Sequence, residues 1–111
     1  MRSKQPNIDK KKIINIMKKF PDKIPLYVVR QHGSRLNELP KQKYLVPRTM
    51  TLGEFSLYIR KQISLSSSQA LFFFFNQTLE NQSKTMSELY KIHKNENCIL
   101  VIAYDTENTF G

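Results

Sequence analysis

The segment Lys43-Tyr44-Leu45-Val46-Pro47, followed three residues later by Thr51-Leu52-Gly53-Glu54-Phe55, carries the pattern that decides the fold. Lys43 to Val46 predicts a short β-strand, which Pro47 ends because proline has no amide N–H to give to a sheet. Thr51 with Glu54 three residues later fits a capping box and predicts the start of a helix. The helix extends to Ile63 along one apolar stripe, formed by Leu52, Phe55, Ile59 and Ile63 with Tyr58 beside it.

Further elements are predicted on both sides of this strand and helix. Apolar residues at helical spacing, with lysines on the remaining face, predict a helix with Asp9 as N-cap that ends at Phe20, before Pro21. β-Branched and aromatic residues predict strands at Ile24–Arg30, Ala70–Phe75 and Cys98–Tyr104, the last unbroken and apolar, as in a central strand buried on both faces. A short strand near Thr78-Leu79 and a short helix over Thr85–His93 lie between the last two strands.

This order of elements predicts one α+β domain in which a helix lies across a single sheet. The chain has 111 residues, enough for one domain and too few for two. We expect residues 1–8 to form an arm of low order, residues 9–104 the domain, and residues 105–111 a polar tail. Within the third predicted strand, Phe72 to Phe75 must point alternately to two faces, so either both faces are covered or one carries exposed aromatics.

Composition narrows the class of protein and its compartment. The net charge is +9, and residues 1–30 carry nine lysines and arginines against two aspartates, a face that attracts acidic peptides, anionic lipids or nucleic acid. Cys98 is the single cysteine, which excludes an intramolecular disulfide, and its apolar context predicts a buried, inert thiol. The longest apolar runs are far shorter than the roughly 18 residues of a membrane span, and the N-terminus lacks a signal-peptide pattern, so we expect a cytoplasmic protein.

The KYLVP and TLGEF blocks resemble a stretch of the autophagy modifiers, the family of autophagy protein 8, light chain 3 and the GABA-receptor-associated protein. Other blocks are similar in the same order: Phe20 to Pro25, Ile59 to Lys61, Ala70 to Phe74, Ile102 to Tyr104, and Glu107 to Gly111. The resemblance covers roughly Lys10 to Gly111. It implies a ubiquitin-like β-grasp fold with an N-terminal helical extension, in which the last strand lies centrally beside the first.

The resemblance also implies a chemistry for the C-terminal glycine, Gly111. In this family an activating enzyme uses ATP to activate the glycine carboxylate. A conjugating enzyme then carries it as a thioester before it forms an amide with phosphatidylethanolamine, on the autophagosome membrane. Glycine suits the reaction because it has no Cβ to block a narrow active site. A cysteine protease that processes and deconjugates the modifier is a further implied partner.

A peptide-docking surface is the second implication of the resemblance. The strand Lys43–Val46 is expected to be a sheet edge that accepts a partner strand by β-augmentation. In the family this edge takes acidic peptides of the aromatic-x-x-aliphatic type, as carried by cargo receptors. One pocket would draw on Ile16, Pro25, Leu45 and Ile99, and the other on Tyr44, Val46, Pro47, Met50, Phe55 and Tyr58. Lys23, Lys43 and Arg60 would meet the acidic flank, and Phe72 and Phe74 match positions tied to conjugation and membrane work.

Several alternatives stay open at this point. The docking residues are also read as ordinary core, with Lys41 and Lys43 only protecting an edge from aggregation. Lys12, Gln62, Tyr58, Cys98 and Ile99 depart from the family pattern, which leaves the peptide preference open. A modifier joined to a protein amine, and a nucleic-acid-binding module that uses the basic N-terminal face, are rival functions. No catalytic motif, metal cluster or phosphate loop is identified, so we expect neither an enzyme nor a cofactor.

Overall fold

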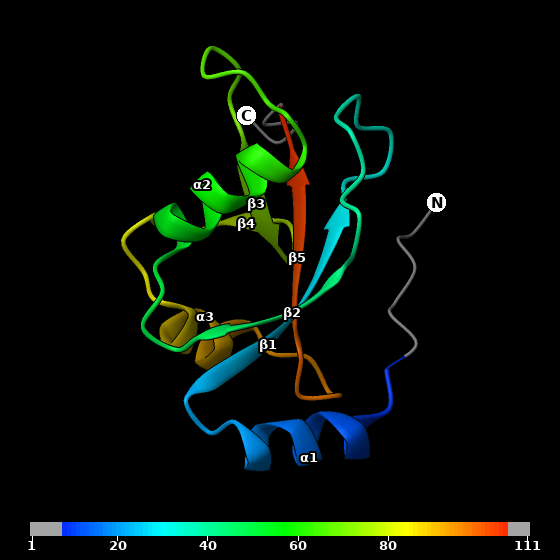
Figure 1. The fold of residues 1–111 in the computed structure, drawn as a ribbon, viewed down its shortest axis with the longest axis vertical. Helices are drawn as coiled ribbons and strands as arrows, with labels where there is room; N and C mark the ends of the chain where they lie inside the picture. Colours follow the sequence, from blue (N-terminus) through cyan, green and yellow to red (C-terminus); the bar gives the residue numbers. More distant parts are fainter. Residues whose placement is uncertain (1–7, 107–111) are drawn as a thin grey trace.

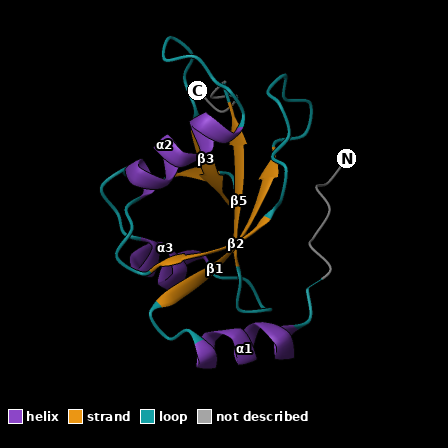
Figure 2. Cartoon of the chain, viewed as in Figure 1, coloured by secondary structure: helices purple, strands orange, loops and turns teal. Residues whose placement is uncertain are grey.

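A mixed five-stranded sheet organises the chain, and two helices cover one of its faces (Figure 1; Figure 2). The computed structural model describes residues 8–106. In chain order the elements are α1 (Lys10–Lys19), β1 (Lys23–Arg30), β2 (Lys43–Pro47), α2 (Leu52–Gln62), β3 (Phe72–Phe75), β4 (Thr78–Leu79), α3 (Met86–His93) and β5 (Leu100–Asp105). The predicted order of elements is confirmed, including the short strand at Thr78-Leu79.

The strands lie in the order β2-β1-β5-β3-β4, so the last strand is central and lies beside the first. β1 and β5 run parallel, with Leu26 opposite Leu100 and Val28 opposite Ile102. The β1–β2, β3–β5 and β3–β4 pairs are antiparallel. This is the ubiquitin-like arrangement that the family resemblance implied, with α1 as the N-terminal helical extension.

The main core fills the space between the sheet and helices α2 and α3. Alternate residues of each strand point into it, because successive side chains of a strand face opposite sides. The largest fully buried members are Tyr104, Phe55, Phe73, Phe75, Ile24, Leu26, Leu52, Ile59, Met86, Leu89 and Leu100. Both covering helices begin at capping boxes, Thr51 with Glu54 and Thr85 with Glu88, which satisfy the amides at their N-termini.

The four consecutive phenylalanines divide between the two faces of the sheet. Phe73 and Phe75 enter the main core, while Phe72 and Phe74 lie on the opposite face. Phe74 is only 3% exposed there, and Phe72 is half-buried. Asn76 and Gln77 both have positive φ angles, as in a type I′ hairpin turn, and join β3 to the two-residue strand β4.

The prediction that Cys98 is buried and begins the last strand is wrong. Cys98 is half-buried and has a φ of 62°, a left-handed conformation that cannot continue a strand. The reason is a tight turn in which the Asn95 side chain accepts from the amides of Asn97 and Ile99. β5 therefore begins at Leu100 and extends through Asp105, and its alternate residues Val101 and Ala103 are only half-buried.

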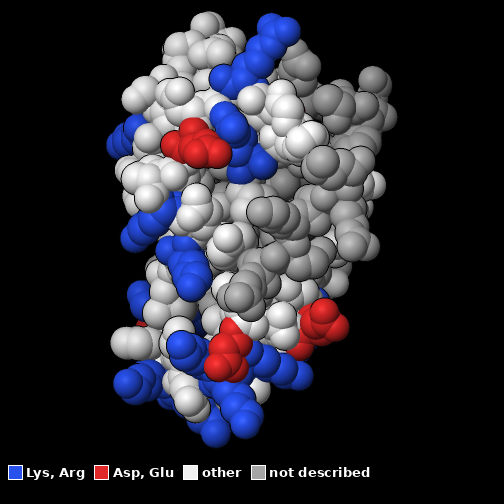
Figure 3. Space-filling view, turned by 90° about the vertical axis from the view of Figure 1, so that its right-hand side faces the viewer, with Lys and Arg blue, Asp and Glu red and all other residues white. Residues whose placement is uncertain are grey.

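α1 lies across the end of the sheet where β1 and β5 begin (Figure 1). Asp9 accepts from the Lys11 amide as its N-cap, as predicted. The Tyr90 hydroxyl of α3 donates to the Cys98 carbonyl at 2.7 Å and lies 3.3 Å from the Met17 sulfur, which ties α1 to α3. Lys10, Lys11, Lys12, Lys18 and Lys19 are all exposed, and Figure 3 shows a cluster of basic side chains at this end, with others along one side and near the top.

Two ion pairs centred on Glu80 connect the segment after β4 to α3. Glu80 lies 3.0 Å from the Lys84 ammonium and 2.5 Å from the His93 ring nitrogen, and the His93 ring stacks on Phe75. Hydrogen bonds from His93 and then from Lys84 hold the pKa of the Glu80 carboxyl below its usual value of 4.5. No helix within residues 8–106 is long and apolar enough to cross a membrane.

Phe73→Ala is expected to lower the free energy of unfolding by about 3–5 kcal/mol, because it empties a fully buried site in the core. Phe72→Ala is the matched control on the opposite face, and we expect it to cost less than half as much, since Phe72 is half-buried. Urea denaturation of both variants measures the difference. Equal losses would contradict the assignment of the two faces.

Glu80→Gln is expected to lower stability at neutral pH, by an amount that shrinks as the pH falls below the usual carboxyl pKa of 4.5. A carboxyl whose folded pKa is depressed contributes stability above its unfolded pKa, and that contribution is lost as the pH falls through the folded pKa. Denaturation curves from pH 7 to pH 3 should therefore converge for the wild type and the variant. A difference that stays constant over this range would show that charge at Glu80 plays no part.

Candidate functional site

β2 is an edge strand, and its side chains alternate between solvent and core. Tyr44 and Val46 are buried, whereas Lys43 and Leu45 are exposed. β2 lies at one end of the strand order and pairs with β1 alone among the described strands. Its outer backbone groups therefore face away from the sheet, in the geometry that accepts an added strand.

Three of the residues predicted to form the second pocket bring their aromatic rings together, whereas Pro47, the register partner of Lys23, lies on the opposite face of the β1–β2 pair. Tyr44 meets Phe55 edge-on at a centroid distance of 5.9 Å and Tyr58 at 6.0 Å, while Tyr58 stacks on Phe55 at 6.3 Å. Phe55 is 1% exposed and belongs to the main core, so it can only form the floor of a site. Tyr58, at 40% exposed, forms its accessible wall. Val46 also lies in the core, Met50 packs against it, and Pro47 is half-buried.

The strand residues predicted to form the first pocket lie on the face of the β1–β2 pair opposite to Tyr44 and Val46. Pro25 and Leu45 are partners in the β1–β2 register, so their side chains share one face. The β1–β5 register, extended one residue before Leu100, places Ile99 beside Pro25. Ile99 and Pro25 are buried, Leu45 is 38% exposed, and Ile16 of α1 is half-buried.

Two of the three predicted cations flank these apolar residues. Lys43 precedes Leu45 by two positions and Lys23 precedes Pro25 by two, so each lies on the same face as its apolar neighbour. Arg60 is placed elsewhere. It follows Tyr58 by two positions and therefore lies on another side of α2. Its guanidinium donates to the carbonyl oxygens of Gln69 at 2.8 Å and Ser66 at 3.3 Å.

The hydroxyl is the one polar group of the Tyr44 side chain, and the segment just before β2 binds it. The hydroxyl donates to the Lys41 carbonyl at 2.9 Å, and the Lys41 ammonium lies 5.1 Å from the centre of the Tyr44 ring. Burial, followed by the neighbouring phenols of Tyr58 and Tyr104, raises the pKa of Tyr44 to about 12. Tyr44 is therefore neutral at any physiological pH.

Sequence reasoning missed one residue of this surface. Tyr27 is the register partner of Lys43 and lies on the same face as Lys23 and Pro25. The period-2 alternation of the first strand could have indicated it, because Lys23, Pro25 and Tyr27 follow one another at alternate positions. Phe72 and Phe74 lie on strand β3, two strands away from β1. The predicted conjugation residue, Gly111, lies outside the described residues.

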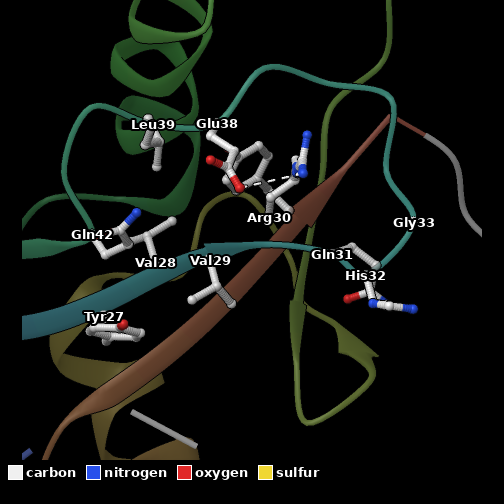
Figure 4. A pocket seen from close by; sticks show the side chains of 11 residues that line it. Tyr27, Val28, Val29, Arg30, Gln31, His32, Gly33, Glu38, Leu39 and Gln42 are labelled. Atoms are coloured by element: carbon white, nitrogen blue, oxygen red, sulfur yellow. Dashed lines mark hydrogen bonds and ion pairs between the residues drawn. The ribbon is translucent and has the colours of Figure 1, made fainter. Parts of the chain in front are cut away.

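A separate pocket of about 550 Å³ lies at the end of β1, under the segment between β1 and β2 (Figure 4). None of the residues predicted for peptide docking lines it. Arg30 and Glu38 point toward each other across its rim and form an ion pair at 3.4 Å. Among residues 8–106 no group of three metal-ligating side chains is gathered at this pocket or elsewhere. Tyr27, the residue that sequence reasoning missed, lines this pocket as well, so the pocket adjoins the docking surface at that one residue.

Comparison with known proteins agrees with the fold. A family model described as "Autophagy protein Atg8 ubiquitin like" matches residues 8–111. Among solved structures, the crystal structure of Trypanosoma brucei ATG8 is similar, with a TM-score of 0.83 and 31% sequence identity, covering 92% of this chain and 88% of that chain. On the sheet order, the edge strand β2 and these matches, the chain belongs to the Atg8 family of ubiquitin-like autophagy proteins.

Proposed function

We propose that this protein is a lipid-conjugated modifier of autophagy. Its Gly111 carboxylate would be activated with ATP, carried as a thioester by a conjugating enzyme and joined to phosphatidylethanolamine on autophagosomal membranes. The family match over residues 8–111 is the observation that carries the proposal. The protein would supply the electrophilic carbonyl, and its partner enzymes would supply the catalytic groups. A two-chain lipid would then hold the domain on the membrane, since each buried methylene is worth roughly 0.8 kcal/mol.

We further propose that the edge of β2 recruits cargo receptors and adaptors through acidic aromatic-x-x-aliphatic peptides. The exposed edge would give backbone hydrogen bonds to an extended peptide. The Tyr44–Phe55–Tyr58 cluster and the Pro25–Leu45 group supply two apolar contact areas on either side of it. Lys23 and Lys43 supply the charge that an acidic flank would meet, and Tyr27 extends the same face.

Lipidation can be tested with Gly111→Ala. Incubated with the family's activating and conjugating enzymes, ATP and vesicles containing phosphatidylethanolamine, the wild type should form the lipid adduct. We expect Gly111→Ala to reduce the rate at least tenfold, because a Cβ beside the carbonyl obstructs the enzyme active sites. Gel mobility and mass spectrometry identify the product. Adducts to protein amines alone would support the protein-conjugated alternative instead.

Peptide docking can be tested on exposed residues whose loss leaves the core intact. We expect Leu45→Ala and Tyr58→Ala each to weaken binding of an acidic aromatic-x-x-aliphatic peptide by about tenfold, as anchor residues of an interface do. Leu57→Ala is the matched control, because Leu57 is 63% exposed on α2 but is not part of the proposed surface. Calorimetry gives the affinities. A control that loses as much affinity as the other two would argue against this surface.

A further inference from the structure

The last described residues of the chain are fixed between two segments that are distant in the sequence. Asp105 ends β5 and is only 6% exposed. Ser34, between β1 and β2, donates its hydroxyl to the Asp105 carboxylate at 2.8 Å, and the Thr106 amide donates to the same oxygen at 2.7 Å. On the other side, the Thr106 hydroxyl donates to the Ala70 carbonyl at 2.9 Å, just before β3. We call Ser34, Asp105, Thr106 and Ala70 the clamp.

The supports of the clamp are themselves held in place. The Ser34 hydroxyl also accepts from the Leu36 amide, and the Arg30 guanidinium donates to the Leu36 carbonyl at 2.8 Å. The Tyr104 hydroxyl, within β5, donates to the Asn37 carbonyl at 2.7 Å. The segment that carries Ser34 is thus bound to the end of β5 at several points. A carboxylate as buried as that of Asp105 is costly unless its oxygens find such partners.

The position of the clamp gives it a consequence for the C-terminus. Gly111 is the fifth residue after Thr106, and a chain of five residues reaches at most about 17 Å. Gly111 therefore lies within that distance of Thr106, whichever path the residues between them take. Misplacement of a reacting group by about 1 Å can cost on the order of 10²-fold in rate. The clamp fixes the point from which the last five residues leave the domain, and with it the region that Gly111 can reach.

We propose that Asp105, Ser34 and Thr106 are positioning residues that aim the C-terminal segment, so that Gly111 reaches the activating and conjugating enzymes from one direction. This inference rests on the proposed lipid conjugation. It assigns these three side chains a role in the conjugation reaction and none in peptide docking. The docking strand β2 is separated from β5 by β1 in the sheet.

The test compares side chains that lose a clamp bond with side chains that keep it. Thr106→Val with Ser34→Ala removes both hydroxyl donors at nearly constant shape. Thr106→Ser keeps the hydroxyl, and Asp105→Asn keeps an oxygen that can accept from Ser34 and the Thr106 amide. We expect the double variant to lower kcat of conjugation to phosphatidylethanolamine vesicles about tenfold at an unchanged KM. We expect Thr106→Ser and Asp105→Asn to stay within twofold of the wild type in kcat.

A second measurement does not depend on the enzymes. Hydrogen exchange at the Thr106 amide should be at least tenfold faster in the double variant, while peptide binding at β2 should be unchanged and report an intact fold. Wild-type kcat or wild-type exchange in the double variant would overturn the positioning role alone. A wild-type protein that is never conjugated would overturn the proposed function together with it. If Thr106→Ser and Asp105→Asn lowered kcat as much as the double variant does, that result would also refute the clamp.

Discussion

The parallel pairing of β1 with β5 is the constraint on which the rest of the structure depends. It joins segments about seventy residues apart and places a strand from each end of the domain at the centre of the sheet. Such a long-range contact is costly in chain entropy, and the core repays that cost only when both strands bury their alternate residues under α2 and α3. The exposed fraction is 0% for each of the core-facing residues of the pair: Leu26, Val28, Leu100, Ile102 and Tyr104.

The proposed docking edge and the clamp both lie at the margins of this central pair. Because β5 occupies one side of β1, β2 can pair only on the other and becomes an edge. Because β1 and β5 run in the same direction, both end at the same pole, where Ser34 follows β1 and Asp105 ends β5. α1 lies at the opposite pole, so the exposed lysines of that helix are separated from the clamp by the length of the sheet (Figure 1).

Local patterns in the sequence were sufficient for most elements of the fold. The capping box at Thr51 and the apolar stripe after it located α2 to within one residue at each end. The order of the strands was not contained in such patterns and came from the family resemblance. Cys98 was assigned wrongly because its apolar neighbours hide the turn made by Asn95, a side chain–backbone contact that hydrophobic periodicity does not detect.

The candidate site was predicted unevenly, for a similar reason. Leu45 and Pro25 were assigned to one pocket from the resemblance, and the strand register places them on one face because alternation fixes which face each residue occupies. Arg60 was grouped by its charge, but its helical position turns it toward Ser66 and Gln69. The clamp could not be foreseen at all, because Ser34, Ala70 and Asp105 meet only once the sheet has formed.

The two margins of the sheet are unequal, and this has a consequence for valency. β2 offers five residues along its free side, whereas β4 offers two, cut short by the left-handed turn at Asn76 and Gln77. A strand-adding protein with two long free sides can build open-ended ribbons from copies of itself. With one usable side, each molecule is monovalent for an added strand. Many copies on one surface would therefore act as independent single binding sites. Their avidity for a multivalent partner would be set by the density of the copies.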